Sequence, residues 1–194
     1  MILLKAIQVL FGKMNFRKMK KYILIPQGIK PNDTIGIVAP ASPFEEDKFN
    51  KGIEVLKSMG FNVYIPKGLF EKRGYHAGND RHRAELINKM FADKNIKAIM
   101  CAKGGFGSMK ALPFIDFKTI AKNPKLFIGF SDISVLLSVF YSKSHLMVLH
   151  APVVTSLRKA DKKTKEFFRF AVSLKKETII KPENGVTIKT GFCS

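Results

Sequence analysis

The chain has 194 residues, and its 34 Lys and Arg against 15 Asp and Glu give it a formal net charge of +19. Its two cysteines exclude the disulfide framework of a small secreted domain, and reduced thiols favour a cytoplasmic location. The length is sufficient for one globular domain with a substantial core.

Residues 1–28 are expected to form a basic extension. Residues 1–12 are mostly apolar and the basic run 13–21 follows them, whereas a secretory signal has the opposite order. The apolar run is too short to span a bilayer, so we expect no transmembrane segment. Two interpretations of the extension remain: a loosely packed segment, or an amphipathic basic helix on an anionic membrane surface.

Apolar runs of strand length alternate with helical patterns along the rest of the chain. The expected strands are 34–39, 62–65, 96–102, 126–130 and 147–150, and the expected helices are 45–59, 80–92, 133–141 and 162–174. Asn79 or Asp80 is suited to cap the second helix, and Gly60 to end the first. The alternation predicts an α/β domain over residues 29–175, with a doubly wound parallel sheet and flanking helices. Short strands are expected at 178–180 and 186–188, in a linker over 176–194.

Ser131 is the candidate nucleophile. It follows the apolar run 126–128 through Gly129 and Phe130, and precedes a helical pattern. A serine on a sharp strand-to-helix turn exposes its hydroxyl for attack on a carbonyl. The alternative is that Ser131 or Asp132 only caps the helix. Ile133 occupies the place of the last glycine in the Gly-x-Ser-x-Gly motif.

A glycine cluster at 104–107 follows the expected strand 96–102. Glycine at a strand end lets the backbone approach a ligand and leaves amides free to point at an anion. Because carboxyl ends of parallel strands share one edge, this loop and Ser131 would face one crevice, which is an arrangement for acyl transfer. A Walker-type phosphate loop is disfavoured, since Gly107 leads to Ser108 and Met109 instead of Lys and Ser or Thr.

The positive charge makes nucleic acid an alternative partner. The densest lysine runs, at 18–21 and 159–165, lack interleaved aromatics that could stack bases. A solvated lysine-rich surface, with no specific nucleic-acid site, is the favoured interpretation.

Several blocks of the chain resemble the LD-carboxypeptidase family, which are serine peptidases of murein recycling and microcin immunity. The blocks are 33–40 (DTIGIVAP), 77–83 (AGNDRHR), 103–108 (KGGFGS), 124–132 (PKLFIGFSD) and 150–152 (HAP). They follow the family's order and spacing over about residues 30–152. Lys103 and Ala151 depart from the pattern, where the family usually has Arg and Gly.

The resemblance implies a class I glutamine amidotransferase-like or flavodoxin-like fold. It implies Ser131 as the catalytic nucleophile, and an oxyanion hole from backbone amides of Asp132 and of Gly104 or Gly105. It also implies Lys103 and His150 as pocket-lining residues. The implied reaction removes the terminal D-alanine of murein tetrapeptides by cleaving an L,D-peptide bond, without metal or cofactor. Family members also often form homodimers.

In this family a Glu and a His from a C-terminal domain complete the triad, so this chain is expected to be a truncated nucleophile domain with impaired activity. Loss of the base would remove most of the rate enhancement, on the order of a million-fold. Four histidines could substitute in principle: His76, His82, His145 and His150. None has an obvious reason to reach Ser131. A non-catalytic remnant that binds D-amino-acid peptides is therefore a second hypothesis.

Overall fold

The computed structural model describes residues 23–174, and beyond them only the backbone of residues 179–180 and 188–189. Most of the expected extension, residues 1–22, lies outside the described residues, as does Cys193. Residues near the end of that extension contact the domain. The Leu24 amide donates to the His145 carbonyl at 2.8 Å, and the Met147 amide donates to the Leu24 carbonyl at 2.9 Å.

The core of the molecule is a parallel sheet with the strand order β2-β1-β3-β4-β5, which confirms the predicted α/β fold. The strands are β1 (Thr34–Val38), β2 (Asn62–Tyr64), β3 (Ile96–Cys101), β4 (Leu126–Gly129) and β5 (Leu149–His150). The chain goes from β1 to β2 on one side and then to β3 on the other. This switch point lies between β1 and β3, and in such sheets ligands bind outside the carboxyl ends of the strands there.

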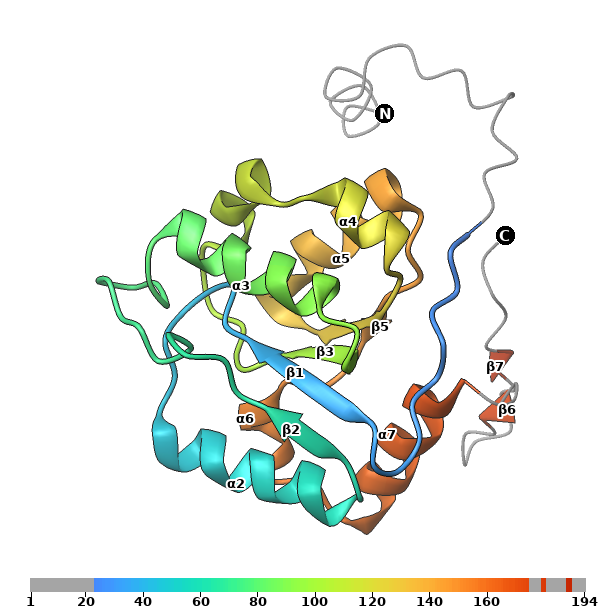
Figure 1. Cartoon of the computed structure of the whole chain (residues 1–194). Coiled ribbons are helices and arrows are strands. Elements are labelled where there is room, and N and C mark those ends of the chain that lie inside the picture. The colour runs from blue at the N-terminus through green and yellow to red at the C-terminus, as the bar shows by residue number, and fades with distance from the viewer. Residues whose placement is uncertain (1–22, 175–178, 181–187, 190–194) are drawn as a thin grey trace.

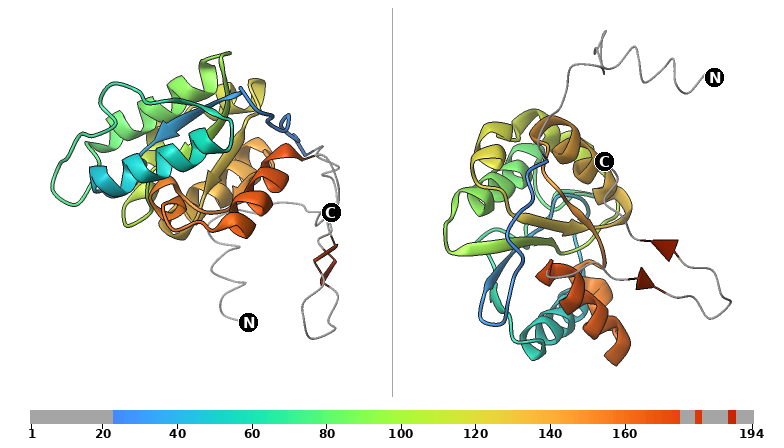
Figure 2. Two further views of the ribbon diagram at one scale, coloured as in Figure 1. Left: turned by 90° about the horizontal axis from the view of Figure 1, so that it is seen from below. Right: turned by 90° about the vertical axis from the view of Figure 1, so that its right-hand side faces the viewer.

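Helices cover both faces of the sheet (Figures 1 and 2). One layer contains α2 (Glu46–Ser58), α6 (Val154–Leu157) and α7 (Lys162–Ser173). The other layer contains α3 (Asp80–Ala92), the 3-10 segment η2 (Ser108–Phe114), α4 (Phe117–Lys122) and α5 (Ser134–Ser144). A short 3-10 turn, η3 (Ser131–Ile133), directly precedes α5. The four predicted helices are confirmed. The sequence patterns did not predict η2, α4 and α6.

Alternating side chains of the strands build two separate cores. On β4, Leu126 and Ile128 pack toward α2 and α7, while Phe127 packs toward α3 and α5. This is the two-residue period of a strand covered on both faces. Asn79 caps α3, because its side chain accepts a hydrogen bond from the His82 amide at 2.8 Å.

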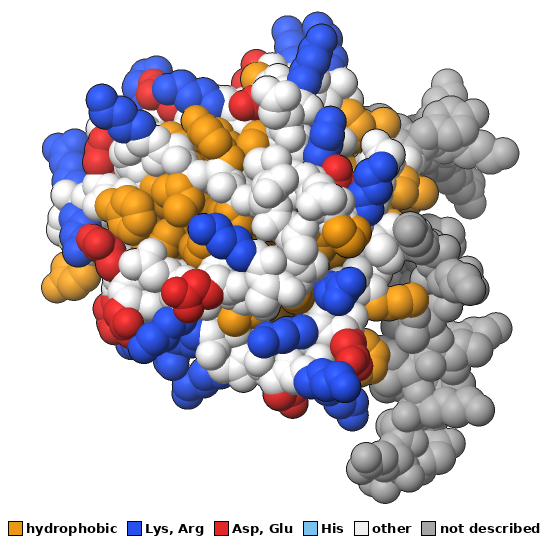
Figure 3. Space-filling model, turned by 60° about the horizontal axis from the view of Figure 1, so that its bottom comes forward, with side chains coloured by type: hydrophobic (Ala, Val, Ile, Leu, Met, Phe, Trp, Pro, Cys, Tyr) orange, Lys and Arg blue, Asp and Glu red, His pale blue; other side chains and the backbone are white. Residues whose placement is uncertain are grey.

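The predicted short strands beyond α7 correspond to β6 (Ile179–Ile180) and β7 (Ile188–Lys189), which pair antiparallel. Among the described residues, no helix has both the length and the apolar character needed to cross a membrane. Figure 3 shows Lys and Arg side chains scattered over one face of the molecule, with acidic and hydrophobic side chains between them. The positive charge therefore forms no continuous stripe on this face.

Candidate functional site

The turn after β4 places Ser131 at the carboxyl edge of the sheet. Phe130 is extended, with φ of −153°, and Ser131 then takes the left-handed conformation, with φ of 64°. Positive φ is uncommon for a residue other than glycine. Gly129 allows the turn to be sharp, because a Cβ there would lie 2.6 Å from Cγ2 of Ile133. The Ser131 side chain is exposed directly before η3 and α5, as in the strand-turn-helix geometry of a nucleophilic serine.

The first turn of the following helix takes no cap from these side chains. Within the described residues the Ser131 hydroxyl has no hydrogen-bond partner, and neither η3 nor α5 has a side-chain cap. The Asp132 carboxylate instead accepts a hydrogen bond from the Ser108 amide at 2.9 Å. The interpretation of Ser131 or Asp132 as a mere helix cap is therefore wrong, and the hydroxyl is free to meet a ligand.

The glycine loop after β3 lies against Ser131. A Cβ at Gly104 would lie 3.1 Å from Cβ and 3.4 Å from Oγ of Ser131. Gly105 has φ of 116°, and a Cβ there would lie 2.3 Å from Oγ of Ser42. The structure thus brings Gly104 and Ser131 together, as predicted from the strand order, whereas Gly105 lies against Ser42. Within the described residues the amides of Gly104, Gly105 and Asp132 donate no hydrogen bond.

A buried arginine holds the glycine loop to the end of β1. Arg83, on the first turn of α3, is 1% exposed. Its Nη1 donates to the carbonyl of Pro40 at 2.8 Å and to that of Gly107 at 3.0 Å, and its Nη2 pairs with Asp80. Because Pro40 follows β1 and Gly107 follows β3, one guanidinium fixes the two loops of the switch point.

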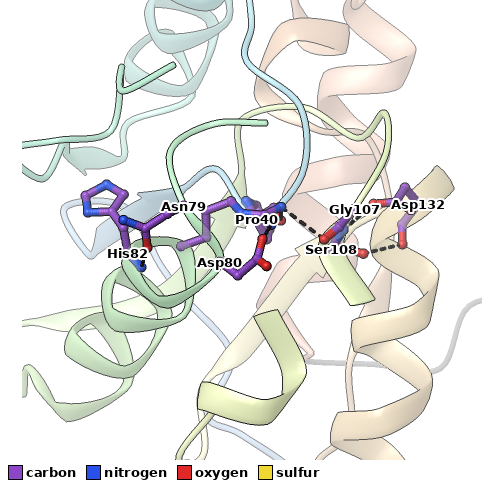
Figure 4. A network of polar contacts seen from close by, with 8 residues as sticks. Pro40, Asn79, Asp80, His82, Gly107, Ser108 and Asp132 are labelled. Carbon is purple, nitrogen blue, oxygen red and sulfur yellow. Dashed lines mark hydrogen bonds and ion pairs between the residues drawn. The ribbon is translucent and has the colours of Figure 1, made fainter. Parts of the chain in front are cut away.

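A second connection joins the glycine loop to the serine turn. Ser108 is fully buried; its amide bonds to the Asp132 carboxylate, and its hydroxyl donates to the Asp132 carbonyl at 2.8 Å. Figure 4 shows Ser108 and Asp132 facing each other across these two bonds. The backbone of the residue after the candidate nucleophile is therefore held in place from both its carbonyl and its side chain.

Within the part of the chain that the structure describes, three of the four histidines make no hydrogen bond with the serine hydroxyl. His82 Nε2 lies 3.0 Å from the Gly68 carbonyl oxygen, and His145 lies at the end of α5 opposite Ser131. His150 is exposed, and its ring centroid lies 6.3 Å from that of Phe130. None of these three is hydrogen-bonded to Ser131 within the described residues.

His76 lies under the glycine loop. A Cβ at Gly107 would lie 2.6 Å from its Nε2, which has no hydrogen-bond partner among the described residues. Burial lowers the pKa of His76, and the charges of Arg83 and Lys110 lower it further. The imidazole of His76 therefore favours its neutral form. Its ring packs against Gly107.

The two predicted pocket residues line different pockets. Lys103 lines a pocket of about 330 Å³ between the start of α2 and α6, where its Nζ donates to the Pro43 carbonyl at 3.2 Å. His150 lines a pocket of about 430 Å³ against α7. Ser131 lines neither of these two pockets.

Comparison with known proteins matches this chain to a family. The family model of the LD-carboxypeptidase N-terminal domain matches residues 35–151. The chain belongs to the LD-carboxypeptidase family.

Two relatives of this chain have names that refer to murein peptides. The probable murein peptide carboxypeptidase of Bacillus subtilis is 37% identical over 131 residues, which are 68% of this chain and 41% of the relative. The murein tetrapeptide carboxypeptidase of Pseudomonas aeruginosa is 34% identical over 124 residues, which are 63% of this chain and 40% of the relative. The chain therefore spans less than half the length of these curated relatives.

A solved structure of the microcin immunity protein MccF in complex with glutamyl sulfamoyl guanosine superposes on this domain. Its TM-score is 0.78 at 29% identity, and the match covers 82% of this chain and 51% of that one. The family thus includes carboxypeptidases and a microcin self-immunity protein.

Sequence reasoning missed two residues that hold the loops of the candidate site in place, Arg83 and Ser108. Both lie within the blocks that carried the resemblance. Arg83 follows Asp80 by three residues on α3, a spacing that permits an ion pair but does not show burial. Neither their burial nor their partners on other loops could be inferred from local spacing.

Proposed function

We propose that this chain supplies the nucleophile domain of a serine carboxypeptidase that removes the terminal D-alanine of murein tetrapeptides. The names of the relatives support the substrate class. A role in recycling cell-wall fragments, in the cytoplasm, follows from that assignment as part of the same proposal.

The observation that carries the proposal is the left-handed, exposed Ser131 with Gly104 packed against it. In the proposed reaction, Oγ of Ser131 attacks the carbonyl carbon of the L,D-peptide bond and D-alanine leaves with a proton. Amides of Asp132 and of Gly104 or Gly105 would stabilise the oxyanion, and their lack of other partners supports this role. Water then hydrolyses the acyl-serine.

A serine hydroxyl needs a general base to act as a nucleophile. Because no described side chain is hydrogen-bonded to Ser131, we place the base, a Glu and His pair, outside the described residues. His150 is the described histidine to test as a substitute, since it lies opposite Gly129 in the register of β4 and β5.

Covalent labelling with a fluorophosphonate probe, followed by release of D-alanine from murein tetrapeptide, tests the proposal. We expect Ser131→Ala to abolish both signals, because it removes the attacking oxygen. Ser138→Ala is the matched control, since Ser138 is an exposed serine on α5 that bonds only to the Ser134 carbonyl. Because the base is placed outside the described residues, labelling is expected to be slow, and labelling that persists in Ser131→Ala would contradict the assignment of Ser131 as nucleophile.

The unpartnered Ser131 hydroxyl favours one second candidate, a non-catalytic domain that binds D-amino-acid peptides. Such a domain would bind N-acetyl-L-alanyl-D-alanine without releasing D-alanine or reacting with the probe. Binding and labelling measured on the same preparation distinguish the two functions.

A further inference from the structure

Ser42, in the loop after β1, contacts the glycine loop on both sides of Gly105. Its Oγ accepts a hydrogen bond from the Phe106 amide at 3.0 Å. Its own amide donates a weaker bond to the Gly104 carbonyl, at 3.4 Å. A Cβ at Gly105 would lie 2.3 Å from Oγ of Ser42. One serine therefore holds the two peptide groups that flank Gly105.

The loop that carries Ser42 is itself fixed by the residues just before it. The Pro40 carbonyl accepts a hydrogen bond from Nη1 of Arg83 at 2.8 Å. The Ala41 carbonyl accepts one from the Ala77 amide at 2.9 Å. Ser42 is half-buried directly after these two anchored residues. It is therefore an ordered support for the glycine loop, and it comes from a different strand end.

The geometry of the peptide group decides where the Gly105 amide points. A trans peptide group is planar, and its C=O and N–H point in opposite directions. The Gly104 carbonyl and the Gly105 N–H belong to one such group, which is trans. Because this carbonyl is directed at the Ser42 amide, the Gly105 N–H is directed away from Ser42.

Gly104 faces Ser131 on the other side of the same peptide group. A Cβ at Gly104 would lie 3.1 Å from Cβ of Ser131, so this group lies between Ser42 and the candidate nucleophile. Glycine has wide conformational freedom, and Gly105 has φ of 116°. The contacts with Ser42 restrict this freedom. A donor that is fixed beforehand costs no reorganisation when charge develops on an oxyanion.

We propose that Ser42 is a positioning residue, which holds the glycine loop so that the Gly105 amide, and not the Gly104 amide, is presented to the oxyanion. This inference rests on the proposed function, because only a reaction at Ser131 forms that oxyanion. Ser42 acts through the glycine loop and takes no part in making or breaking bonds. Without its hydroxyl, the peptide groups on either side of Gly105 lose their main restraint.

The test uses the boronic acid analogue of N-acetyl-L-alanine on the full 194-residue chain. Its boron bonds reversibly to a serine oxygen and places a second oxygen in the position of the oxyanion. Affinity at equilibrium therefore reports on the oxyanion hole without requiring turnover. In ¹⁵N-labelled parent protein, we expect the amide signals of Gly105 and Asp132 to move downfield on binding, and that of Gly104 to move less.

Ser42→Ala should weaken binding of the boronic acid about tenfold and remove the downfield shift of the Gly105 amide. Ser42→Thr keeps a hydroxyl and should restore both. Ser58→Ala is the matched control, since Ser58 is an exposed serine on α2 whose hydroxyl donates to the Val55 carbonyl at 2.8 Å. Hydrogen exchange at the Ala77 amide reports whether the loop after β1 stays folded in each variant.

Gly105→Ala is a second variant, which displaces the loop without changing Ser42. It should weaken binding at least as much as Ser42→Ala, because its methyl would collide with Oγ of Ser42. The inference would be overturned by an unchanged affinity in Ser42→Ala, a loss that Ser42→Thr does not restore, an equal loss in Ser58→Ala, or a larger shift at Gly104 than at Gly105.

The same titration separates this inference from the proposed function. If the parent binds the boronic acid, Ser131→Ala does not, and Ser42→Ala binds it as well as the parent, the nucleophile assignment stands and the role of Ser42 is wrong. If the parent and Ser131→Ala bind it equally, the nucleophile assignment is wrong, and the role of Ser42 fails with it.

Discussion

A buried cation lies at each end of α3, Arg83 at the first turn and Lys125 at the last, and the two have different structural roles. At the carboxyl edge of the sheet, Arg83 bonds to carbonyls of two separate loops. At the opposite edge, Lys125 is 8% exposed, and its Nζ donates to the Met90 carbonyl at 2.7 Å and to the Asp93 carbonyl. Arg83 connects the loops of the candidate site, whereas Lys125 only closes the last turn of one helix.

The helix dipole explains which cation follows the local preference. A cation at a helix C-terminus is favourable, so Lys125 stabilises α3 where the local field favours it. Arg83 lies in the first turn, where the dipole opposes a cation, and the adjacent Asp80 compensates for this. The position of Arg83 is therefore explained by its tertiary contacts and not by the helix dipole. These contacts fix the glycine loop beside Ser131.

The largest expected effect comes from Arg83→Met. Its loss leaves the Pro40 and Gly107 carbonyls without their donor, so we expect a fall in the free energy of unfolding of about 2–3 kcal/mol. We also expect probe labelling of Ser131 to slow at least about tenfold. Urea unfolding and labelling kinetics measure the two effects, and hydrogen exchange at the Ser108 amide reports whether the loop has loosened.

Lys125→Met is the counterpart at the other edge. It should lower stability by about 1–2 kcal/mol while leaving the labelling rate and the Ser108 exchange unchanged. If both variants slowed labelling equally, the distinction between a site-holding and a helix-closing cation would be wrong.

Gly104→Ala should have an intermediate effect confined to the site. The added methyl would lie 3.2 Å from the Phe130 carbonyl oxygen as well as close to Ser131. We expect labelling to slow about tenfold with a stability loss of about 1 kcal/mol. Gly36→Ala is the matched control, because its methyl would meet the flexible Met90 side chain, with Sδ at 2.7 Å. Equal labelling in both variants would exclude crowding of the nucleophile.

The last expected effect, on stability alone, is a pH dependence at the Lys125 edge. Burial lowers the pKa of Lys125 from 10.5 to about 8. Above pH 8 the native side chain loses its proton while the unfolded chain retains it up to about pH 10.5, so the unfolded state binds more protons. The free energy of unfolding should therefore rise with pH across this window, by at most about 1.4 kcal/mol per pH unit.

Urea unfolding of the parent and of Lys125→Met at pH 7.5, 8.5 and 9.5 measures this slope. The parent should show the steeper rise, since the variant lacks the titrating group. Lys122→Met controls for the general loss of positive charge at high pH. Parallel slopes in the parent and in Lys125→Met would show that Lys125 does not titrate in this range.

The sequence alone was sufficient for the strands, the long helices and the serine turn. Continuous apolar runs predicted the strands, periodic apolar residues predicted α2, α3 and α7, and Asn79 or Asp80 predicted the start of α3; all of these are local signals. The sequence also predicts the turns at Gly129, Ser131 and the glycine loop, because the geometry of a turn depends on only a few neighbouring residues. Their meeting at one edge followed from the parallel strand order.

Only the tertiary structure decided η2, α4 and α6, the contacts of Arg83, and the separation of Lys103 and His150 into two pockets. Segments as short as α6 cannot be stable alone and depend on packing, here of Val154 against Gly52 of α2. The sequence does not distinguish Arg83 from a solvated arginine, because the two carbonyls that it bonds lie on loops 43 and 24 residues away along the chain. Periodicity reports neighbours within an element, whereas contacts between distant loops exist only once the sheet has formed.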